Sequence, residues 1–249
     1  MRDIFSDLSA PELSDPDPVR RAQIQMKQPL PKRFYKEVGI GDEGFAVLLD
    51  GRPVKTPGKR PLALPTRAAA SLVAREWDAQ EKEINPRNMP VTRLANTAID
   101  GVSPEIDAVF DDIVKFAGTD LLCYRAENPQ SLVALQAEHW DPVVFWAAEA
   151  LGARFILAQG IIHRQQPQEA LAAFAAALQK YRSAHQLAAL HAMTSLTGSA
   201  ILPLAYAEGR MTAEMAWQAA HVDEDFNIGQ WGTDAEAEAR RAARWIEMQ

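Results

Sequence analysis

The sequence predicts an α+β protein, with a small antiparallel sheet covered by a helix in its N-terminal part and an all-α helical bundle after it. Between residues 33 and 64, apolar and polar side chains alternate in short runs separated by turn residues, which is typical of strands. From residue 66 onward, apolar side chains recur every three or four positions, which is typical of helices. A length of 249 residues favours two domains over a single core. We therefore expect a flexible N-terminal arm at 1–32, an α+β strand-rich domain at 33–101 and a helical bundle domain at 102–249.

The N-terminal arm is expected to be flexible because residues 1–32 are polar, contain several prolines and show no apolar periodicity. The first residues have neither the apolar core of a secretory signal nor the acid-poor, arginine-rich composition of an organellar transit peptide. We therefore expect a cytoplasmic protein.

The charge and the distribution of apolar residues argue against nucleic acid and membrane as partners. A net charge of −7 and a pI near 5.3 argue against a nucleic-acid partner, because binding to phosphate needs a basic surface. The most apolar region, from Leu132 to Ile162, is interrupted by charged side chains, so we expect no membrane insertion.

The predicted sheet is built around a hairpin. Apolar residues alternate from Phe45 to Leu49 and are followed by Asp50 and Gly51, a dipeptide that favours a two-residue turn with positive φ at both positions. The return strand continues through Thr56, and Leu62 and Leu64 predict a short further strand. A sheet this small needs a cover for its apolar face, and the helix predicted at residues 66–82 is the candidate.

The helix at residues 66–82 carries its apolar side chains on one face. Ala69, Val73 and Trp77 recur at spacings of four, with Leu72 beside them. Trp77 has a large apolar ring and a single N–H group, a combination that suits a position between two modules. We therefore predict that Trp77 is the structural seam between the two domains, and that replacing it with arginine destabilises the protein.

The remaining helices are predicted from proline or capping residues at their starts and from glycine at several ends. They cover 91–99, 103–117, 128–152 with a kink or a new start at Pro142, 167–181, 187–207 with a kink or break at Pro203, 215–226, and 233 to the C-terminus. In the last helix, Thr233 and Glu236 match a capping box, and Glu236 and Arg240 are spaced for an ion pair.

The sequence lacks the usual signs of catalysis or metal binding. Cys123 is the single cysteine and lies in an apolar run, which favours a buried structural thiol over a nucleophile. The string Gly39 to Gly44 matches G-x-G-x-x-G, but it joins two predicted strands and contains two acidic residues, so we interpret it as a turn. The five histidines lack metal-ligand spacing. We predict no catalytic, cofactor-binding or metal residues and no cofactor.

One acidic run lies beside aromatic residues. Asp223, Glu224 and Asp225 are followed by Phe226 and, a few residues later, by Trp231. Aromatic anchors with a polar rim are typical of protein interfaces. The alternatives are an ordinary solvated helix face for the acidic residues and core packing for Trp231.

Four strings, taken in order along the chain, carry a family resemblance. They are RFYKEVGIGDEGFAVLLDGRPVKTPGKRPLALPT, REWDAQ, MPVTRLANTAID and DFNIGQWG. Together they resemble the assembly chaperone of the ATP synthase F(1) sector that binds the free alpha subunit, a family of mitochondria and related bacteria. The resemblance runs from about Arg33 to Trp231.

The resemblance implies a non-enzymatic chaperone with an α+β N-terminal part and an orthogonal helical bundle. It implies binding of the unassembled alpha subunit, whose beta-facing surface is masked until the beta subunit displaces the chaperone. Asp223, Glu224, Asp225, Phe226 and Trp231 are then the expected protein-binding residues. The expected protein is a monomer of the bacterial cytoplasm, with relatives in the mitochondrial matrix.

Two other hypotheses stay open at this point. The chain could be a protein-binding adaptor with no chaperone role. It could also be an enzyme on an unfamiliar fold, which would need titratable groups converging on a pocket.

Overall fold

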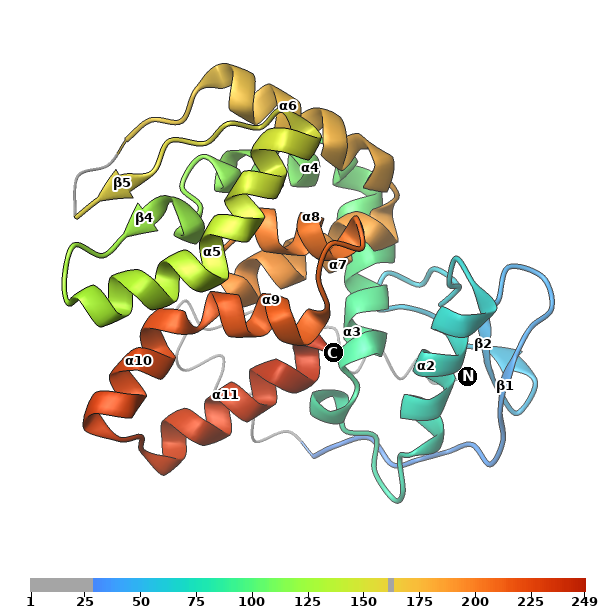
Figure 1. Cartoon of the computed structure of the whole chain (residues 1–249). Coiled ribbons are helices and arrows are strands. Elements are labelled where there is room, and N and C mark those ends of the chain that lie inside the picture. The colour runs from blue at the N-terminus through green and yellow to red at the C-terminus, as the bar shows by residue number, and fades with distance from the viewer. Residues whose placement is uncertain (1–28, 161–163) are drawn as a thin grey trace, which may run out of the picture. The chain divides into compact units, whose positions relative to one another are not determined.

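The structure of the chain is a computed structural model that describes residues 29–160 and 164–249. The chain divides into two compact units, Met1–Pro104 and Glu105–Gln249 (Figure 1). The sequence-based boundary between 101 and 102 lies a few residues earlier. Of the predicted arm, residues 1–28 lie outside the described residues.

The sheet of the first unit has three antiparallel strands in the order β1 (Val38–Ile40), β2 (Val47–Leu49) and β3 (Arg52–Pro53). The hairpin prediction is confirmed, because Asp50 and Gly51 have φ angles of 47° and 76°. The further strand predicted at Leu62 and Leu64 is reduced to isolated bridges, in which Ala63 pairs with Ala46 and Pro61 with Lys55. Pro61 and Pro65 flank these residues and have no N–H to extend the ladder.

Helix α2 (Arg67–Asp78) covers this sheet, as predicted, and begins where the Thr66 hydroxyl accepts a hydrogen bond from the N–H of Ala69. It ends at Asp78, before the predicted end at residue 82. At that end the Arg33 guanidinium donates to the carbonyl of Asp78 at 2.8 Å. The expectation that Leu72 faces inward is wrong: its side chain is 44% exposed, because Ala70, Val73 and Trp77 form the buried face.

Trp77 lies in the core of the first unit. Its ring is 1% exposed and packs at 5.8 Å, centroid to centroid, against the ring of Tyr35, whose hydroxyl donates to the Trp77 carbonyl at 2.5 Å. Leu62 and Ile84 belong to the same buried cluster. The side chain therefore joins α2 to residues near the sheet, and its predicted place in a seam between the domains stays a prediction.

Glu76 connects α2 to the helical segment that follows. That segment consists of η1 (Pro86–Asn88), α3 (Pro90–Asn96) and the wider turn η2 (Thr97–Val102), in place of the single helix predicted at 91–99. The half-buried Glu76 carboxylate accepts hydrogen bonds from the N–H of Val91 at 2.7 Å and from the N–H and hydroxyl of Thr92 at 2.7 and 2.6 Å. It thereby satisfies donors that the start of α3 leaves unpaired.

We predict that Glu76→Ala lowers the free energy of unfolding by about 2 kcal/mol, because it leaves the donors at the start of α3 without their acceptor. Chemical denaturation of the purified variant measures this loss. Glu81→Ala removes a nearby but exposed carboxylate and is the control. Equal unfolding free energies for the two variants would contradict the connecting role of Glu76.

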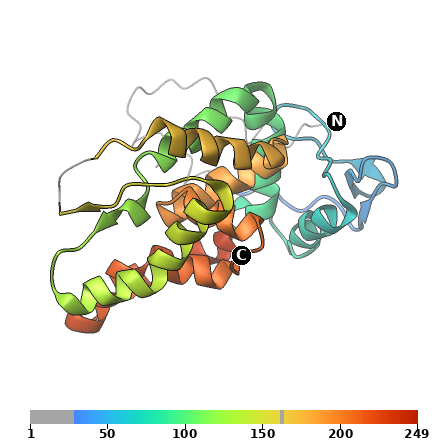
Figure 2. The ribbon, with the colours of Figure 1, turned by 45° about the horizontal axis from the view of Figure 1, so that its top comes forward.

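The second unit is built from helices. In chain order they are η3 (Ser103–Glu105), which joins the units in sequence, α4 (Ile106–Ala117), η4 (Leu121–Cys123), α5 (Gln130–Leu151), α6 (Gln168–Leu178), η5 (Gln179–Tyr181), α7 (Ala184–Thr197), α8 (Ile201–Ala207), α9 (Ala213–Ala220), α10 (Val222–Trp231) and α11 (Ala235–Met248). Two short parallel strands, β4 (Tyr124–Arg125) and β5 (Ala158–Gln159), lie at one edge (Figure 1). Helix α6 packs on α4 and α5, and α7 packs on α4 and α8 (Figure 2). The α+β class with a helical bundle is confirmed.

Several helix boundaries differ from the prediction. The helix expected at 187–207 is two helices, and the break falls at Gly198, whose φ of 68° ends α7 in a left-handed cap, and not at Pro203. The helix expected at 215–226 is broken at His221. Pro142 lies inside a continuous α5.

The start of the last helix also differs by one residue. The side chain of Asp234, and not that of Thr233, caps α11 by accepting from the N–H of Ala237 at 2.8 Å. The prediction of a capping box formed by Thr233 and Glu236 is therefore wrong. The predicted ion pair between Arg240 and Glu236 is present, with a distance of 2.5 Å between its nitrogen and oxygen atoms.

The core of the second unit contains large apolar side chains, among them Trp140, Phe174, Leu187 and Ile201. Cys123 is 1% exposed, and burial raises the pKa of its thiol to about 12, which agrees with the predicted structural role. Within residues 29–160 and 164–249, no helix has both the length and the apolar character needed to cross a membrane.

Candidate protein-binding site

Helix α10 carries all five residues that the sequence singles out for protein binding. It is connected to α11 by a short turn (Figure 1), and the carboxylate of Asp225 on α10 forms an ion pair with Arg241 on α11. Arg244, also on α11, donates to the carbonyl of Leu196 on α7 at 2.6 Å. The two helices are thus fixed both to each other and to the rest of the unit.

The first predicted contact residue, Asp223, has an intramolecular partner. The side-chain amide of Gln136 on α5 donates to the half-buried Asp223 carboxylate at 2.7 Å. The oxygen of the same amide accepts from the N–H of Ala126 at 2.8 Å. This arrangement assigns Asp223 to the attachment of α10 on α5.

Glu224 and Asp225 are more exposed. The Glu224 side chain is 44% exposed, and its carboxylate lies 3.8 Å from Nε2 of His221. The Asp225 side chain is 48% exposed, with Arg241 as its partner. Of the three acidic residues, Glu224 is therefore the one with the weakest contact inside the chain.

A buried histidine marks the break between α9 and α10. Nδ1 of His221 lies 2.7 Å from the carbonyl of Trp217, so this nitrogen carries the proton and donates. The His221 ring also lies 3.9 Å from the Trp217 ring, which in turn contacts Trp245 on α11 at 5.4 Å. Burial lowers the pKa of His221, so the ring is neutral at neutral pH.

Trp231 is the most exposed large apolar side chain among the described residues. It is 87% exposed at the C-terminal end of α10, so the alternative of core packing is wrong for this residue. Glu224, Ile228 and Trp231 follow one another at spacings of four and three and therefore share one face of the helix. That face combines an acidic group with an aromatic ring open to solvent.

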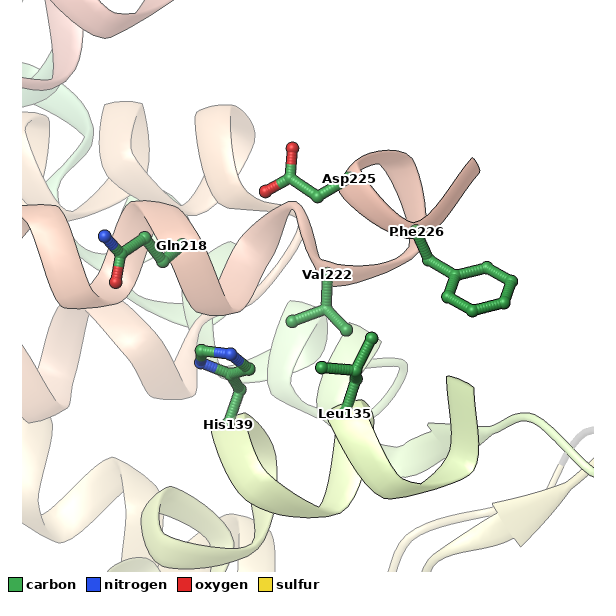
Figure 3. A pocket seen from close by; sticks show the side chains of 6 residues that line it. All are labelled: Leu135, His139, Gln218, Val222, Asp225 and Phe226. Atoms are coloured by element: carbon green, nitrogen blue, oxygen red, sulfur yellow. The ribbon is translucent and has the colours of Figure 1, made fainter. Parts of the chain in front are cut away.

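The opposite face of α10 borders a cavity of about 370 Å³ between α5, α9 and α10 (Figure 3). Its lining residues are Leu135, His139, Gln218, Val222, Asp225 and Phe226. Asp225 and Phe226 were predicted contact residues, whereas the other four were not singled out from the sequence. The spacing of four between Leu135 and His139 could have indicated a shared face of α5.

The cavity does not have the arrangement that the enzyme hypothesis needs. Its titratable lining groups are His139 and Asp225, and the carboxylate of Asp225 is already paired with Arg241. Among the residues that the structure describes, no three His, Cys, Asp or Glu side chains come together in a way that could hold a metal ion.

Comparison with known proteins gives consistent matches. The family model described as ATP12 chaperone protein matches residues 32–148. The crystal structure of a proposed chaperone from Agrobacterium tumefaciens is 58% identical, with a TM-score of 0.87, and covers 100% of this chain and 93% of its own. The crystal structure of Atp12 from Paracoccus denitrificans is 45% identical, with a TM-score of 0.80, covering 88% of this chain and 94% of its own. A mutant of that protein matches at 44% identity with the same TM-score of 0.80 and the same coverage.

These matches, to proteins of the same fold, define a chaperone. More narrowly, the chain belongs to the ATP12 chaperone family.

Proposed function

We propose that this chain assists assembly of the F(1) sector of ATP synthase by binding the unassembled alpha subunit. It covers the beta-facing surface of the alpha subunit until the beta subunit displaces it. An unassembled subunit exposes apolar surface that is normally covered by its neighbour, and such surface aggregates. Binding lowers the concentration of the aggregation-prone form by mass action, with no cofactor and no turnover.

The observation that supports this proposal most directly is the 87% exposure of Trp231 on a helix fixed by neighbouring elements. Tryptophan is enriched among the residues that dominate binding energy at protein interfaces. An exposed apolar ring is stabilised when a partner removes it from water, whereas a core tryptophan gains nothing from a partner. Glu224, on the same face, supplies a charge at the rim.

The overall charge of the helical unit agrees with a client that presents basic groups. Residues 105–249 contain about twice as many acidic as basic side chains. A field of one sign accelerates association with an oppositely charged surface and disfavours wrong partners. We propose that the free chaperone is a monomer of the bacterial cytoplasm and that its interface with the alpha subunit buries about 1,600 Å².

We predict that Trp231→Ala weakens binding to the alpha subunit by about tenfold or more, because it removes an anchor without disturbing the core.

Glu224→Lys is expected to weaken binding to the alpha subunit mainly at low salt, because it reverses a charge at the rim of the interface. Binding to purified alpha subunit is measured by calorimetry, and the melting temperature of each variant checks the fold. Tyr206→Ala, which removes another exposed aromatic from α8, is the control.

Affinity purification from a cell extract tests the proposal as a whole. We expect the main co-purified protein to be free alpha subunit, without assembled synthase. Capture of a different protein would favour the adaptor hypothesis, and turnover of a small molecule by the purified chain would favour an enzyme.

A further inference from the structure

Gln136 on α5 is a buried glutamine whose amide has a different partner on each side. The residue is 3% exposed. Its amide oxygen accepts a hydrogen bond from the N–H of Ala126 at 2.8 Å, and its amide nitrogen donates to the carboxylate of Asp223 on α10 at 2.7 Å. A carboxylate in this place would offer acceptors alone, and an ammonium group would offer donors alone. The position therefore needs an amide, because one neighbour donates and the other accepts.

Helix α10 has little apolar burial to fix its direction. Among its residues, all of which the structure describes, only Val222 is buried. Figure 3 shows Val222 directed toward Leu135 of α5, and the cavity described above lies beside this pair. Side chains that face a cavity lack the close contacts that fix one helix against another. The polar contacts of Asp223 and Asp225 therefore decide where α10 points.

The contact of Asp223 is the better shielded of these two. The Asp225 side chain is 48% exposed, so solvent and salt weaken its ion pair with Arg241. The amide of Gln136 is buried, and the carboxylate that it meets is half-buried. A hydrogen bond away from water costs more to break, because its groups then stay unpaired. The bond between Gln136 and Asp223 is therefore the main polar attachment of α10.

Helix α5 also holds the chain on the other side of the break at His221. The indole N–H of Trp140, one turn after Gln136, donates to the carbonyl of Ala219 at 2.7 Å, and Trp140 is fully buried. Helix α5 thus fixes the end of α9 through Trp140 and the start of α10 through Gln136. These two contacts together set the angle between α9 and α10.

A small change of this angle has a large effect at Trp231. The helix rises about 1.5 Å per residue, so Trp231 lies roughly 12 Å from Asp223 along its axis. A change of about 10° in the direction of α10 moves Trp231 by about 2 Å. Binding residues need to be held to within about 0.5 Å of their place.

From these contacts we infer that Gln136 is a positioning residue. Through Asp223 it sets the direction of α10 and thereby holds Trp231 where the client binds. Asp223 serves the interface as the acceptor for Gln136, and the client does not recognise its charge. The inference rests on the proposed function, because it takes the unassembled alpha subunit as the client and Trp231 as its contact. It gives Asp223 a different role from the direct contact that the sequence predicts.

Two substitutions of Asp223 separate the hydrogen bond from the charge. Both remove the charge, but asparagine keeps an acceptor for the amide of Gln136, whereas alanine does not. We expect Asp223→Ala to raise the Kd for purified alpha subunit by about tenfold or more, and Asp223→Asn by no more than about threefold, measured by calorimetry. Equal losses in the two variants would show that the client recognises the charge, and would overturn the inference.

Exchanging the two groups tests the contact itself. Gln136→Glu keeps the acceptor for Ala126 but places a second carboxylate against Asp223, so we expect Kd to rise by about tenfold or more. Adding Asp223→Asn to this variant lets the introduced amide donate to the introduced carboxylate, and we expect Kd to return to within about threefold of the wild-type value. Gln130→Glu adds the same charge at an exposed position of α5 and is the control, with an expected change below about twofold.

Amide hydrogen exchange of the free chain measures the attachment of α10 without the client. In Gln136→Glu we expect residues 222–231 to exchange faster, while α4 and α7 keep their wild-type rates. The double variant is expected to restore the wild-type rates of α10. Faster exchange throughout the second unit would mean that Gln136→Glu does not fold, and the two substitutions of the half-buried Asp223 then decide.

The possible outcomes separate the role of Gln136 from the proposed function. If the wild-type chain does not bind the alpha subunit, the proposed function fails, and this inference fails with it. If the wild-type chain binds and Gln136→Glu binds equally well, Gln136 does not position the client site and the proposed function stands. The inference is also wrong if the double variant binds as weakly as Gln136→Glu while its α10 exchanges at the wild-type rate, because the charge of Asp223 is then what the client contacts.

Discussion

Trp77→Arg is expected to prevent folding of the first unit or to lower its free energy of unfolding by about 5 kcal/mol or more. The Trp77 side chain is 1% exposed, and its ring packs from α2 against the ring of Tyr35. Truncating a buried tryptophan alone costs about 3–5 kcal/mol, and the arginine adds a charge for which the apolar cluster has no counter-ion. Circular dichroism and chemical denaturation of the purified variant measure the loss.

A second substitution on α2 separates the effect of losing a buried ring from the effect of placing arginine in this helix. Leu72→Arg introduces the same residue at a position that is 44% exposed, so we expect a change within about 0.5 kcal/mol. A Trp77→Arg protein as stable as Leu72→Arg would show that the ring does not support the core of this unit.

The sheet and its covering helix could be predicted because their signals are local. Asp50 and Gly51 adopt positive φ for reasons contained in two residues, and Thr66 caps the turn that follows it. The inward face of α2 was predicted less well. Ala70 lies on the same side of α2 as Val73 and Trp77, whereas Leu72 lies nearly opposite to Ala70 and is exposed. The sequence-based stripe runs through Ala69 and Leu72, and it therefore lies to one side of the face that is buried.

The helix breaks at Gly198 and His221 could not be predicted from periodicity. Apolar residues continue at helical spacing across both positions, so the pattern alone indicates unbroken helices. What breaks the second one is a buried ring whose partner, Trp217, lies one turn earlier, with Trp245 packed behind it. The rings of His221, Trp217 and Trp245 come together only when α11 packs against α9 in the folded unit.

Contacts between distant parts of the chain also limit what the sequence predicts at the candidate site. The sequence proposed contact residues that all lie on α10, which stays a prediction, and it treated Asp223, Glu224 and Asp225 as equivalent. The structure gives them different partners, because Gln136 reaches Asp223 across 87 positions of the chain and Arg241 reaches Asp225 from α11. The cavity was missed for the same reason, since Leu135 and Phe226 become neighbours only in the folded unit.

Asp120→Ala is expected to be the second strongly destabilising change, with a loss of roughly 4 kcal/mol at neutral pH. The Asp120 side chain is fully buried and accepts four hydrogen bonds. The donors are the N–H of Leu122 at 3.0 Å, the hydroxyl of Ser199 at 3.0 Å, and the N–H groups of Ala200 at 2.7 Å and Ile201 at 3.0 Å. Alanine leaves all of these donors buried without an acceptor. Chemical denaturation at pH 7 measures the loss.

Asp120→Asn is the matched comparison, because it keeps the shape of the side chain. One carboxylate oxygen accepts three of the four bonds, so an amide oxygen in that place preserves them. The amide nitrogen then faces the N–H of Leu122 and loses one bond. We expect Asp120→Asn to cost clearly less than Asp120→Ala, and equal losses would contradict the assigned network.

The same residue makes stability depend on pH in a predictable direction. Burial raises the pKa of Asp120 from 3.8 to about 6, against the effect of its four donors. Because the folded state holds this proton more tightly than the unfolded state, the group contributes stability that is fully present below about pH 4 and is lost as the pH rises through about 6. The rise of the Asp120 pKa from 3.8 to about 6 corresponds to about 3 kcal/mol of unfolding free energy.

Unfolding free energies of the wild-type protein and of Asp120→Asn at pH 4 to 7.5 isolate this contribution, because the other titrating groups cancel in the difference. We expect the wild-type protein to gain stability relative to Asp120→Asn as the pH falls from 7 to 4. A difference that does not change over this range would show that Asp120 stays ionised in the folded state, held by its four donors against the cost of burial.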